Sequence, residues 1–382
     1  MRFALSAEQA ELKRSARRFL ASHWSSAQVR AATEREPAGP SHAQAWHPLA
    51  EQGWASLLVP EEHGGLGLQW LEVSLLAEET GRALACVPFF STVCLGTNAL
   101  QAAGDDVQLA ERLPVIAAGK LQVTLAFAES THVQPFAIAT TAREADGGFV
   151  LAGRKRYVVD GQTADLLIVS ARAPDTKGED GVALFEVDAR AAGVRIEPVQ
   201  TLDATRPMAH VELHDVRVPR KVKMGDAAAL RRTLDRAAIA LAAESLGGAE
   251  RCLEMAVDYA KTRVQFDRPI GSFQAIKHRL ADLFTLVETA RSAAWYASDV
   301  ASSGDDAELA VAASLAKSYC TEAFFRCAAE NLQVHGGIGF TWEHDAHLYL
   351  KRARGSLTLL GAASHDRERV AEAIGLGAAG GH

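Results

Sequence analysis

The order of two sequence patterns, one typical of helices and one typical of strands, constrains the fold of this chain more than any other feature. Over residues 1–119, Ala- and Leu-rich stretches repeat with helical spacing, and Ser6 with Gln9 forms a capping box at the first of them. Over residues 120–222, short β-branched runs are separated by Gly, Asp or Pro, which is typical of strands. Long Ala- and Leu-rich helices return over residues 223–382. We therefore expect an α+β protein with an N-terminal helical domain, a central antiparallel β domain and a C-terminal domain resembling a four-helix bundle.

Composition excludes several classes of protein. With 48% apolar and 23% charged residues, the 382-residue chain can bury sizeable cores and is not a disordered protein. The net charge of -7 is modest and no basic stripe is present, so neither nucleic acid nor an anionic membrane is an expected partner. No run of 18 uncharged apolar residues suggests a membrane span, and the N-terminus lacks the apolar core of a signal peptide.

The cysteines point to a reducing compartment. Five are present, without a CxxC pair and without a histidine at metal-ligand spacing. We expect a cytoplasmic protein with no disulfide framework and no metal site.

Three segments carry the resemblance to a known family. They are LVPEEHGGLGL at 58–68, YAKTRVQFDRPIGSFQAIKHRLAD at 259–282 and NLQVHGGIGFTWEHDAHLYLKRA at 331–353. They resemble, in order and in separation, a turn, an Arg-x-x-Phe-Gly-x-x-Ile segment and a Gln-x-x-Gly-Gly-x-Gly-[FY] segment of the acyl-CoA dehydrogenase superfamily. Together with the domain order, the resemblance runs over nearly the whole chain and implies the acyl-CoA dehydrogenase fold.

The resemblance implies that FAD spans a subunit boundary of a homotetramer or a related heterotetramer. Arg263 would neutralise the pyrophosphate with its planar fork of donors, Phe266 would pack near the adenine, and Gln274 would lie beside it. At a second helix end, Gln333 would add a side-chain amide, and Gly336 and Gly337 would let the backbone come close to the cofactor. The competing interpretation is that Arg263 caps a helix and that the glycines only form a turn.

The usual catalytic base of the family is missing. In the family, a carboxylate removes the α-proton of the acyl-CoA thioester while the β-hydride passes to flavin N5. The best-known members carry this glutamate in a Tyr-Glu-Gly-Thr stretch, where this chain has Leu360. A second family location, on the first long helix of the C-terminal domain, falls here at Ala237. This chain thus resembles bacterial members in which the glutamate is relocated.

Glu244 is the expected base. It lies seven residues after Ala237, and seven residues return a helix to within about 20° of the same face. Its neighbours are mostly apolar, so desolvation would raise the pKa of Glu244 toward neutrality. The paired Gly247 and Gly248 would leave room for a bulky acyl chain. Asp235, on another face of the same helix, is the alternative base.

The flavin-facing segments depart from the family pattern. Where the family has Thr-Glu-Pro-Gly-x-Gly-Ser-Asp, residues 128–134 keep Glu129 but replace the threonine and the later serine. Where the family has Lys-x-Trp-[IV]-[ST]-Asn-Gly, residues 155–161 have Tyr in place of Trp and Val in place of the hydroxyl residue, so that backbone amides would have to serve N5. The residues expected to face the flavin are Phe127, Ala128, Gln134, Tyr157 and Val159.

The expected function is α,β-dehydrogenation of an acyl-CoA, bulky or branched as in a steroid side chain, with electrons passed to electron-transferring flavoprotein. Two alternatives stay open at this point. The chain could be a flavin-poor subunit of a heteromeric acyl-CoA dehydrogenase, or a flavin oxidase or monooxygenase on the same fold.

Overall fold

The computed structural model describes residues 5–34, 41–303 and 305–376. Their contacts divide the chain into two compact units. The first comprises Met1–Ala31, Ser74–Ala85 and Ala238–His382, and the second comprises Ala32–Val73 and Cys86–Ala237. The three expected domains, 1–119, 120–222 and 223–382, stay a prediction, because this division follows contacts in space and not the order of textures along the chain.

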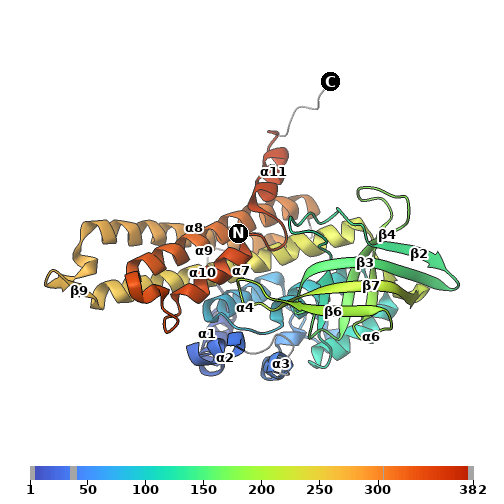
Figure 1. Cartoon of the computed structure of the whole chain (residues 1–382), viewed down its shortest axis with the longest axis horizontal. Helices are drawn as coiled ribbons and strands as arrows, with labels where there is room; N and C mark the ends of the chain where they lie inside the picture. Colours follow the sequence, from blue (N-terminus) through green and yellow to red (C-terminus); the bar gives the residue numbers. More distant parts are fainter. Residues whose placement is uncertain (1–4, 35–40, 304, 377–382) are drawn as a thin grey trace. The chain divides into compact units, whose positions relative to one another are not determined.

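Helices build the first unit. The capping box expected at Ser6 and Gln9 is present and begins the first helix. The helices that lie wholly or partly in this unit are α1 (Ala7–His23), α2 (Ser26–Glu34), α4 (Trp70–Ala83), α7 (Ala227–Thr262), α8 (Gln274–Ser303), α9 (Asp306–His335), α10 (Ala346–Ser356) and α11 (Ala363–Ala373). Helices α8, α10 and α11 pack against α9, and the long helices run side by side in Figure 1. The expected bundle-like arrangement of the C-terminal helices is confirmed.

Two short connections end the long helices. A hairpin of β9 (Val264–Gln265) and β10 (Arg268–Pro269), followed by the 3-10 turn η5 (Ile270–Ser272), joins α7 to α8 at one end of the bundle (Figure 1). The 3-10 turn η6 (Gly336–Phe340) follows α9. Both connections fall in the segments that carry the family resemblance.

Helices α4 and α7 cross with their backbones in contact. A Cβ on Gly247 would lie 1.7 Å from the carbonyl oxygen of Glu78, and a Cβ on Gly81 would lie 1.9 Å from the carbonyl oxygen of Glu244. Any larger residue at either position would force the helices apart, since a side chain cannot share space with a main-chain carbonyl. Glycine at positions 81 and 247 therefore allows α4 and α7 to lie in close contact, and Glu244 lies at this contact.

The second unit contains the sheet. Its strands are β1 (Val123–Ala126), β2 (Thr141–Ala145), β3 (Gly148–Val159), β4 (Leu166–Arg172), β5 (Val182–Asp188), β6 (Val194–Val199), β7 (Met208–Pro219) and β8 (Lys223–Met224). The sheet order is β6-β7-β3-β2-β4-β5-β8, and β1 pairs with β4 off this path. Most pairs are antiparallel, as expected, whereas β1 and β2 each pair with β4 in parallel, so that the sheet is mixed.

Short helices complete the second unit. They are α3 (Ser41–Glu51), α5 (Asn98–Ala103), α6 (Asp106–Ala117), the π-helix η3 (Phe90–Thr97) and the 3-10 turns η1 (Trp54–Ser56), η2 (Glu61–His63) and η4 (Arg220–Val222). The glycine turn expected at 58–68 includes η2, and Gly64 there has a φ of +78°. The π-helix packs against β1, where a Cβ on Gly96 would lie 2.6 Å from the Val123 carbonyl oxygen.

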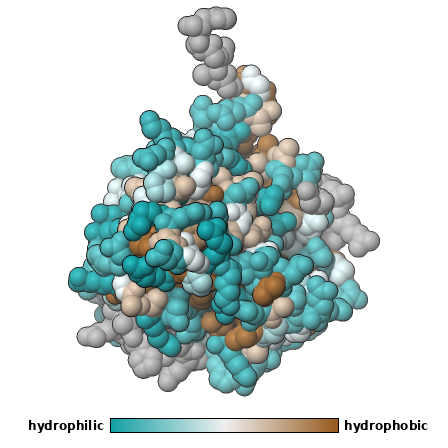
Figure 2. Space-filling model, turned by 90° about the vertical axis from the view of Figure 1, so that its right-hand side faces the viewer, coloured by the Kyte–Doolittle hydropathy of each residue, from teal (hydrophilic) through white to brown (hydrophobic). Residues whose placement is uncertain are grey.

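On the face drawn in Figure 2, hydrophilic residues cover most of the surface and apolar residues are scattered among them. All five cysteines are buried. Within the described ranges, the structure contains no helix long and apolar enough to cross a membrane. The same ranges contain no cluster of His, Cys, Asp or Glu that could hold a metal ion.

Candidate functional site

The hairpin between α7 and α8 presents an exposed aromatic ring. Phe266 and Asp267, with φ of +53° and +59°, form its tight turn. Phe266 is 86% exposed, and its ring stands edge-on to Phe273 at 6.1 Å between centroids. Because most of the Phe266 side chain is exposed, its ring is available to a flat ligand or a second chain.

Arg263 lies at the base of the same hairpin. It is exposed, and among the described residues its side chain has no hydrogen-bond or ion-pair partner; the contacts of this residue are those of its backbone, with Tyr259 and Ile270. The helix-capping interpretation is therefore not supported. Gln274, the first residue of α8, is exposed as well. The guanidinium and the amide are both available to an anionic ligand.

The second segment ends α9 with open backbone. Gln333 is exposed in the last turn, and Gly336 has a φ of +61°. A Cβ on Gly336 or Gly337 would meet nothing within 4 Å. Packing within the described part of the chain requires neither glycine. The positive φ of Gly336 favours glycine by itself, and the open space at both positions allows close approach of a ligand or another chain.

An aromatic stack joins these two segments. The ring of Tyr259, four residues before Arg263, stacks on His335 with centroids 4.3 Å apart and an interplanar angle of 29°. His335 is buried, its Nδ1 lies 2.8 Å from the Asn331 carbonyl oxygen, and its ring also contacts His344 at 4.3 Å. The sequence alone did not indicate this stack, although both residues lie inside the segments that carry the resemblance. The structure therefore brings the ends of α7 and α9 together.

Glu244 is buried, as expected, but its surroundings are not wholly apolar. It is 5% exposed on α7, and its Oε1 accepts a hydrogen bond from Nη1 of Arg352 at 2.8 Å. Arg352, on α10, is itself 3% exposed. The expectation of mostly apolar neighbours missed this charged group, because α10 brings in a cation that lies 108 residues away in sequence. A signal was present: Leu348, Arg352 and Ser356 lie on one buried helical face.

The interpretation of the paired glycines was also wrong. Gly247 packs against the backbone of α4, and a Cβ on Gly248 would lie 2.4 Å from the ring of Phe324. Both positions are filled by neighbouring atoms, so neither glycine opens space for a bulky acyl chain.

The other positions considered for a base are buried. Ala237 is fully buried on α7, and Leu360 is 7% exposed with a φ of +63°. Asp235, the alternative base, is buried on α7 in the second unit.

The expected flavin-facing residues lie around β1 and β3. Phe127 and Ala128 directly follow β1 and are buried, and the Ala128 carbonyl accepts the Arg156 N–H at 2.7 Å. Val159 is buried at the end of β3, where its carbonyl accepts a hydrogen bond from Thr124 Oγ1 at 2.7 Å. Gln134 is exposed in the loop that follows β1. The structure thus brings the ends of β1 and β3 together and places Gln134 at the surface.

Tyr157 occupies a β-bulge. Its φ is +53°, and the register of β3 with β7 shifts between Lys155 and Val158. Its ring stands edge-on to His210 at 5.2 Å. Burial, followed by the charges of Arg154 and Arg156, lowers the pKa of His210. The bulge turns an aromatic side chain out of the ladder, and His210 is a neighbour that the sequence did not indicate.

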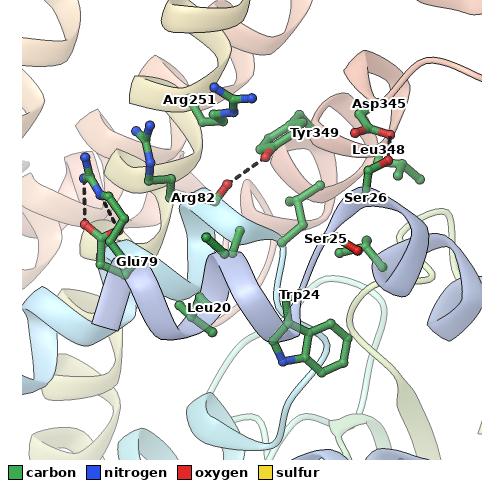
Figure 3. Close-up of a pocket in the computed structure, with 15 residues that line it drawn as sticks. Leu20, Trp24, Ser25, Ser26, Glu79, Arg82, Arg251, Asp345, Leu348 and Tyr349 are labelled. Atoms are coloured by element: carbon green, nitrogen blue, oxygen red, sulfur yellow. Dashed lines mark hydrogen bonds and ion pairs between the residues drawn. The ribbon is translucent and has the colours of Figure 1, made fainter. Parts of the chain in front are cut away.

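A separate cavity of about 340 Å³ lies in the first unit (Figure 3). None of the expected site residues lines it. Two contacts join residues that line it: Arg17 pairs with Glu79 at 2.7 Å, and the Tyr349 hydroxyl donates to the Arg82 carbonyl at 2.7 Å (Figure 3). The residues expected to hold the cofactor thus lie outside the lining of this cavity.

Comparison with known proteins decides the family. The Acyl-CoA dehydrogenase N-terminal, middle and C-terminal domain models match residues 6–120, 124–216 and 225–375. The chain is 34% identical over 368 residues to the acyl-CoA dehydrogenase IpdE2 of Mycolicibacterium smegmatis, covering 96% of this chain and 98% of the relative. The chain is an acyl-CoA dehydrogenase.

Solved structures agree with this dehydrogenase over its length. The Tcur3481-Tcur3483 steroid ACAD G363A variant superposes with a TM-score of 0.86 at 33% identity, covering 96% of this chain and 97% of that one. The ChsE4-ChsE5 complex of Mycobacterium tuberculosis gives 0.89 at 27% identity, covering 98% and 99%. The expected fold class, the enzyme class and FAD as cofactor are confirmed. The exposed side chains of Arg263 and Phe266 and the open glycines of the dehydrogenase fit a ligand that carries an aromatic ring and phosphates.

Proposed function

We propose that this dehydrogenase removes the α-proton of a bulky acyl-CoA thioester with Glu244. The observation that carries the proposal is a buried carboxylate on α7, held by the buried Arg352 of α10. Arg352 places a cation beside the carboxylate, and its Nη1–H donates a hydrogen bond to Oε1 of Glu244 at 2.8 Å. This contact fixes the orientation of the carboxylate that would meet the Cα–H bond.

The reaction is a two-electron oxidation of the acyl chain. Glu244 takes the proton from Cα, and the electron pair of that C–H bond forms the new C=C bond. FAD, when bound, supplies the acceptor for the hydride that leaves Cβ. Burial excludes water from Glu244, so the proton passes to the carboxylate and not to solvent. Electrons then pass to electron-transferring flavoprotein.

The substrate class rests on the relatives. The solved relative at 33% identity is described as a steroid ACAD. We propose that this chain likewise accepts a thioester with a bulky acyl group, of which a steroid side chain is the example. The packing of Gly247 and Gly248 gives no support to this step, so a panel of acyl-CoAs must decide it.

The proposed assembly rests on residues that lie at the surface of the first unit. Arg263, Phe266, Gln274, Gln333, Gly336 and Gly337 lie at the surface. We propose that they bind the adenosine half of an FAD whose flavin half meets Phe127, Ala128, Gln134, Tyr157 and Val159 of another subunit. Both a homotetramer and a heterotetramer satisfy this arrangement. We propose that the enzyme is cytoplasmic and that its three domains span residues 1–119, 120–222 and 223–382.

The test is anaerobic reduction of the bound flavin by acyl-CoAs. Glu244→Gln should keep bound FAD and slow the reduction at least ~100-fold, the usual contribution of a positioned base. Asp235→Asn is the matched variant at the alternative position and should leave the rate unchanged. An unaltered rate in Glu244→Gln removes Glu244 from the mechanism. Failure of every acyl-CoA in the panel to reduce the wild-type flavin refutes the proposed activity itself.

One observation favours a second candidate function. A buried Glu–Arg pair can also have a purely structural role, in which it holds α7 and α10 together. The chain would then be a subunit whose adenosine-binding residues complete the FAD site of a catalytic partner. The visible spectrum of the chain purified alone separates the two. One FAD per subunit supports the homomeric enzyme, whereas a folded and colourless chain supports the flavin-poor subunit.

A further inference from the structure

A lysine is buried in the sheet next to the flavin-facing segment. Lys155, on β3, is 0% exposed. Its Nζ lies 2.5 Å from Oε1 of Glu129 and 3.0 Å from Oγ of Ser170, with the Phe127 carbonyl oxygen at 3.5 Å. Lysine is almost never fully buried unless it is paired, because removing its charge from water is costly. Burial lowers the pKa of Lys155 to about 8 in spite of the Glu129 carboxylate.

The partner of Lys155 holds a loop closed. Oε2 of Glu129 accepts the backbone N–H of Ala139 at 2.6 Å, and Oε1 accepts that of Thr140 at 3.1 Å. Glu129 precedes the loop 130–138 and the two amides follow it. One carboxylate therefore joins the start of this loop to its end, and Lys155 fixes that carboxylate to the sheet.

The loop has little else to define its shape. Residues 130–138 contain only bends and turns, with Gln134 exposed near the middle. Within the loop, the Ala137 N–H donates to the Gln134 carbonyl at 3.1 Å, Ser130 Oγ donates to the His132 carbonyl at 2.5 Å, and Thr131 Oγ1 lies 3.4 Å from His132 Nδ1. Its contacts with other segments include the Arg172 guanidinium to the carbonyl of the buried Ile138 at 3.2 Å and Arg231 over the Phe136 ring at 4.9 Å. A loop held mainly at its two ends changes shape when the ends separate.

We infer that Lys155 and Glu129 are positioning residues, which set the flavin-facing loop 130–138 through one buried ion pair. The inference rests on the proposed flavin half of the site, because Phe127 and Ala128 precede Glu129 and Gln134 lies in the loop. Neither residue needs to touch FAD. Lys155 acts on Glu129, Glu129 acts on the two ends of the loop, and the loop presents its backbone and Gln134 to the flavin.

The inference predicts strong coupling between the two side chains. Lys155→Met leaves the Glu129 charge without its cation, and Glu129→Gln leaves a buried ammonium without its anion. Each single change should release the loop. The double variant, Lys155→Met with Glu129→Gln, leaves no uncompensated charge between the two positions. The double variant should be no worse than either single one.

Two measurements test it. The first is chymotryptic cleavage at the Phe136–Ala137 bond of the FAD-free chain, which we expect to be ~10-fold faster in each single variant. The second is FAD affinity by quenching of flavin fluorescence, expected to be ~10-fold weaker in each. Arg112→Met is the control, since it removes another ion pair of the same unit, Arg112 with the buried Glu186 at 2.7 Å, that does not touch the loop. The control should leave cleavage at this bond unchanged.

The outcomes separate this inference from the proposed activity. Wild-type cleavage and wild-type FAD affinity in both single variants overturn the inference, and so does an equal effect of Arg112→Met. Faster cleavage with unchanged FAD affinity also overturns it, because the loop would then not serve the flavin. None of these readouts requires acyl-CoA oxidation, so a failure of the proposed reaction leaves the test intact.

Discussion

Removing Arg352 should destabilise the first unit far more than an ordinary surface substitution. Arg352 and Glu244 are 3% and 5% exposed, and their 2.8 Å contact joins α10 to α7. Arg352→Met keeps the side-chain length but leaves the Glu244 charge in a dry site without this cation. Breaking a buried pair in this way costs about 3–5 kcal/mol. At roughly 2 °C per kcal/mol for a protein of this size, the midpoint of thermal unfolding should fall by about 6–10 °C.

The double variant makes the prediction specific to the pair. Glu244→Gln combined with Arg352→Met removes both charges, so most of the lost stability should return. Differential scanning fluorimetry at one fixed FAD concentration measures all four proteins. A fall of less than about 2 °C in Arg352→Met, or a double variant whose loss equals the sum of the single losses, would falsify the view that these charges depend on each other.

Three further predictions follow from other contacts. Between pH 8 and 10, the stability of the wild type should rise relative to Lys155→Met by up to ~1.4 kcal/mol per pH unit. The reason is that the pKa of Lys155 is lowered from 10.5 to about 8, so the folded chain releases this proton before the unfolded chain does, and thermal unfolding at several pH values measures the change. Gly247→Ala should lower the thermal midpoint by several degrees, because its Cβ would lie 1.7 Å from the Glu78 carbonyl oxygen, whereas Gly337→Ala, whose Cβ meets nothing, should leave it unchanged. Arg263→Gln should weaken FAD binding ~10-fold or more without changing the stability of the FAD-free chain, since within the described ranges its side chain has no partner; fluorescence titration and scanning fluorimetry together check both halves.

The order of helices and strands could be predicted because it depends on local sequence. The capping box at Ser6 and the β-branched runs after Lys120 identify elements from neighbouring residues alone. The parallel pairing of β1 with β4 could not be predicted in this way. It joins Val123 to Leu166, and which distant strands pair depends on the packing of the whole sheet.

The candidate site shows the same division. Burial of Glu244 followed from its apolar neighbours on α7. The arginine beside it could not be assigned, since the helical face of α10 shows that Arg352 points inward but not which helix it meets. Gly247 and Gly248 were misinterpreted for a similar reason. A glycine in a helix indicates that something comes close, and only the tertiary structure tells whether that is a ligand or another backbone.

The mutual contact of α4 and α7 has a consequence for attempts to alter this enzyme. The main chain of Gly81 touches Glu244 and that of Gly247 touches Glu78, so the two helices behave as one rigid piece that carries the proposed base. In a library of variants, positions 81 and 247 should tolerate almost no replacement, although neither glycine belongs to a ligand site. Engineering of substrate range is better directed to residues away from this crossing, because a shift of one helix would carry Glu244 with it.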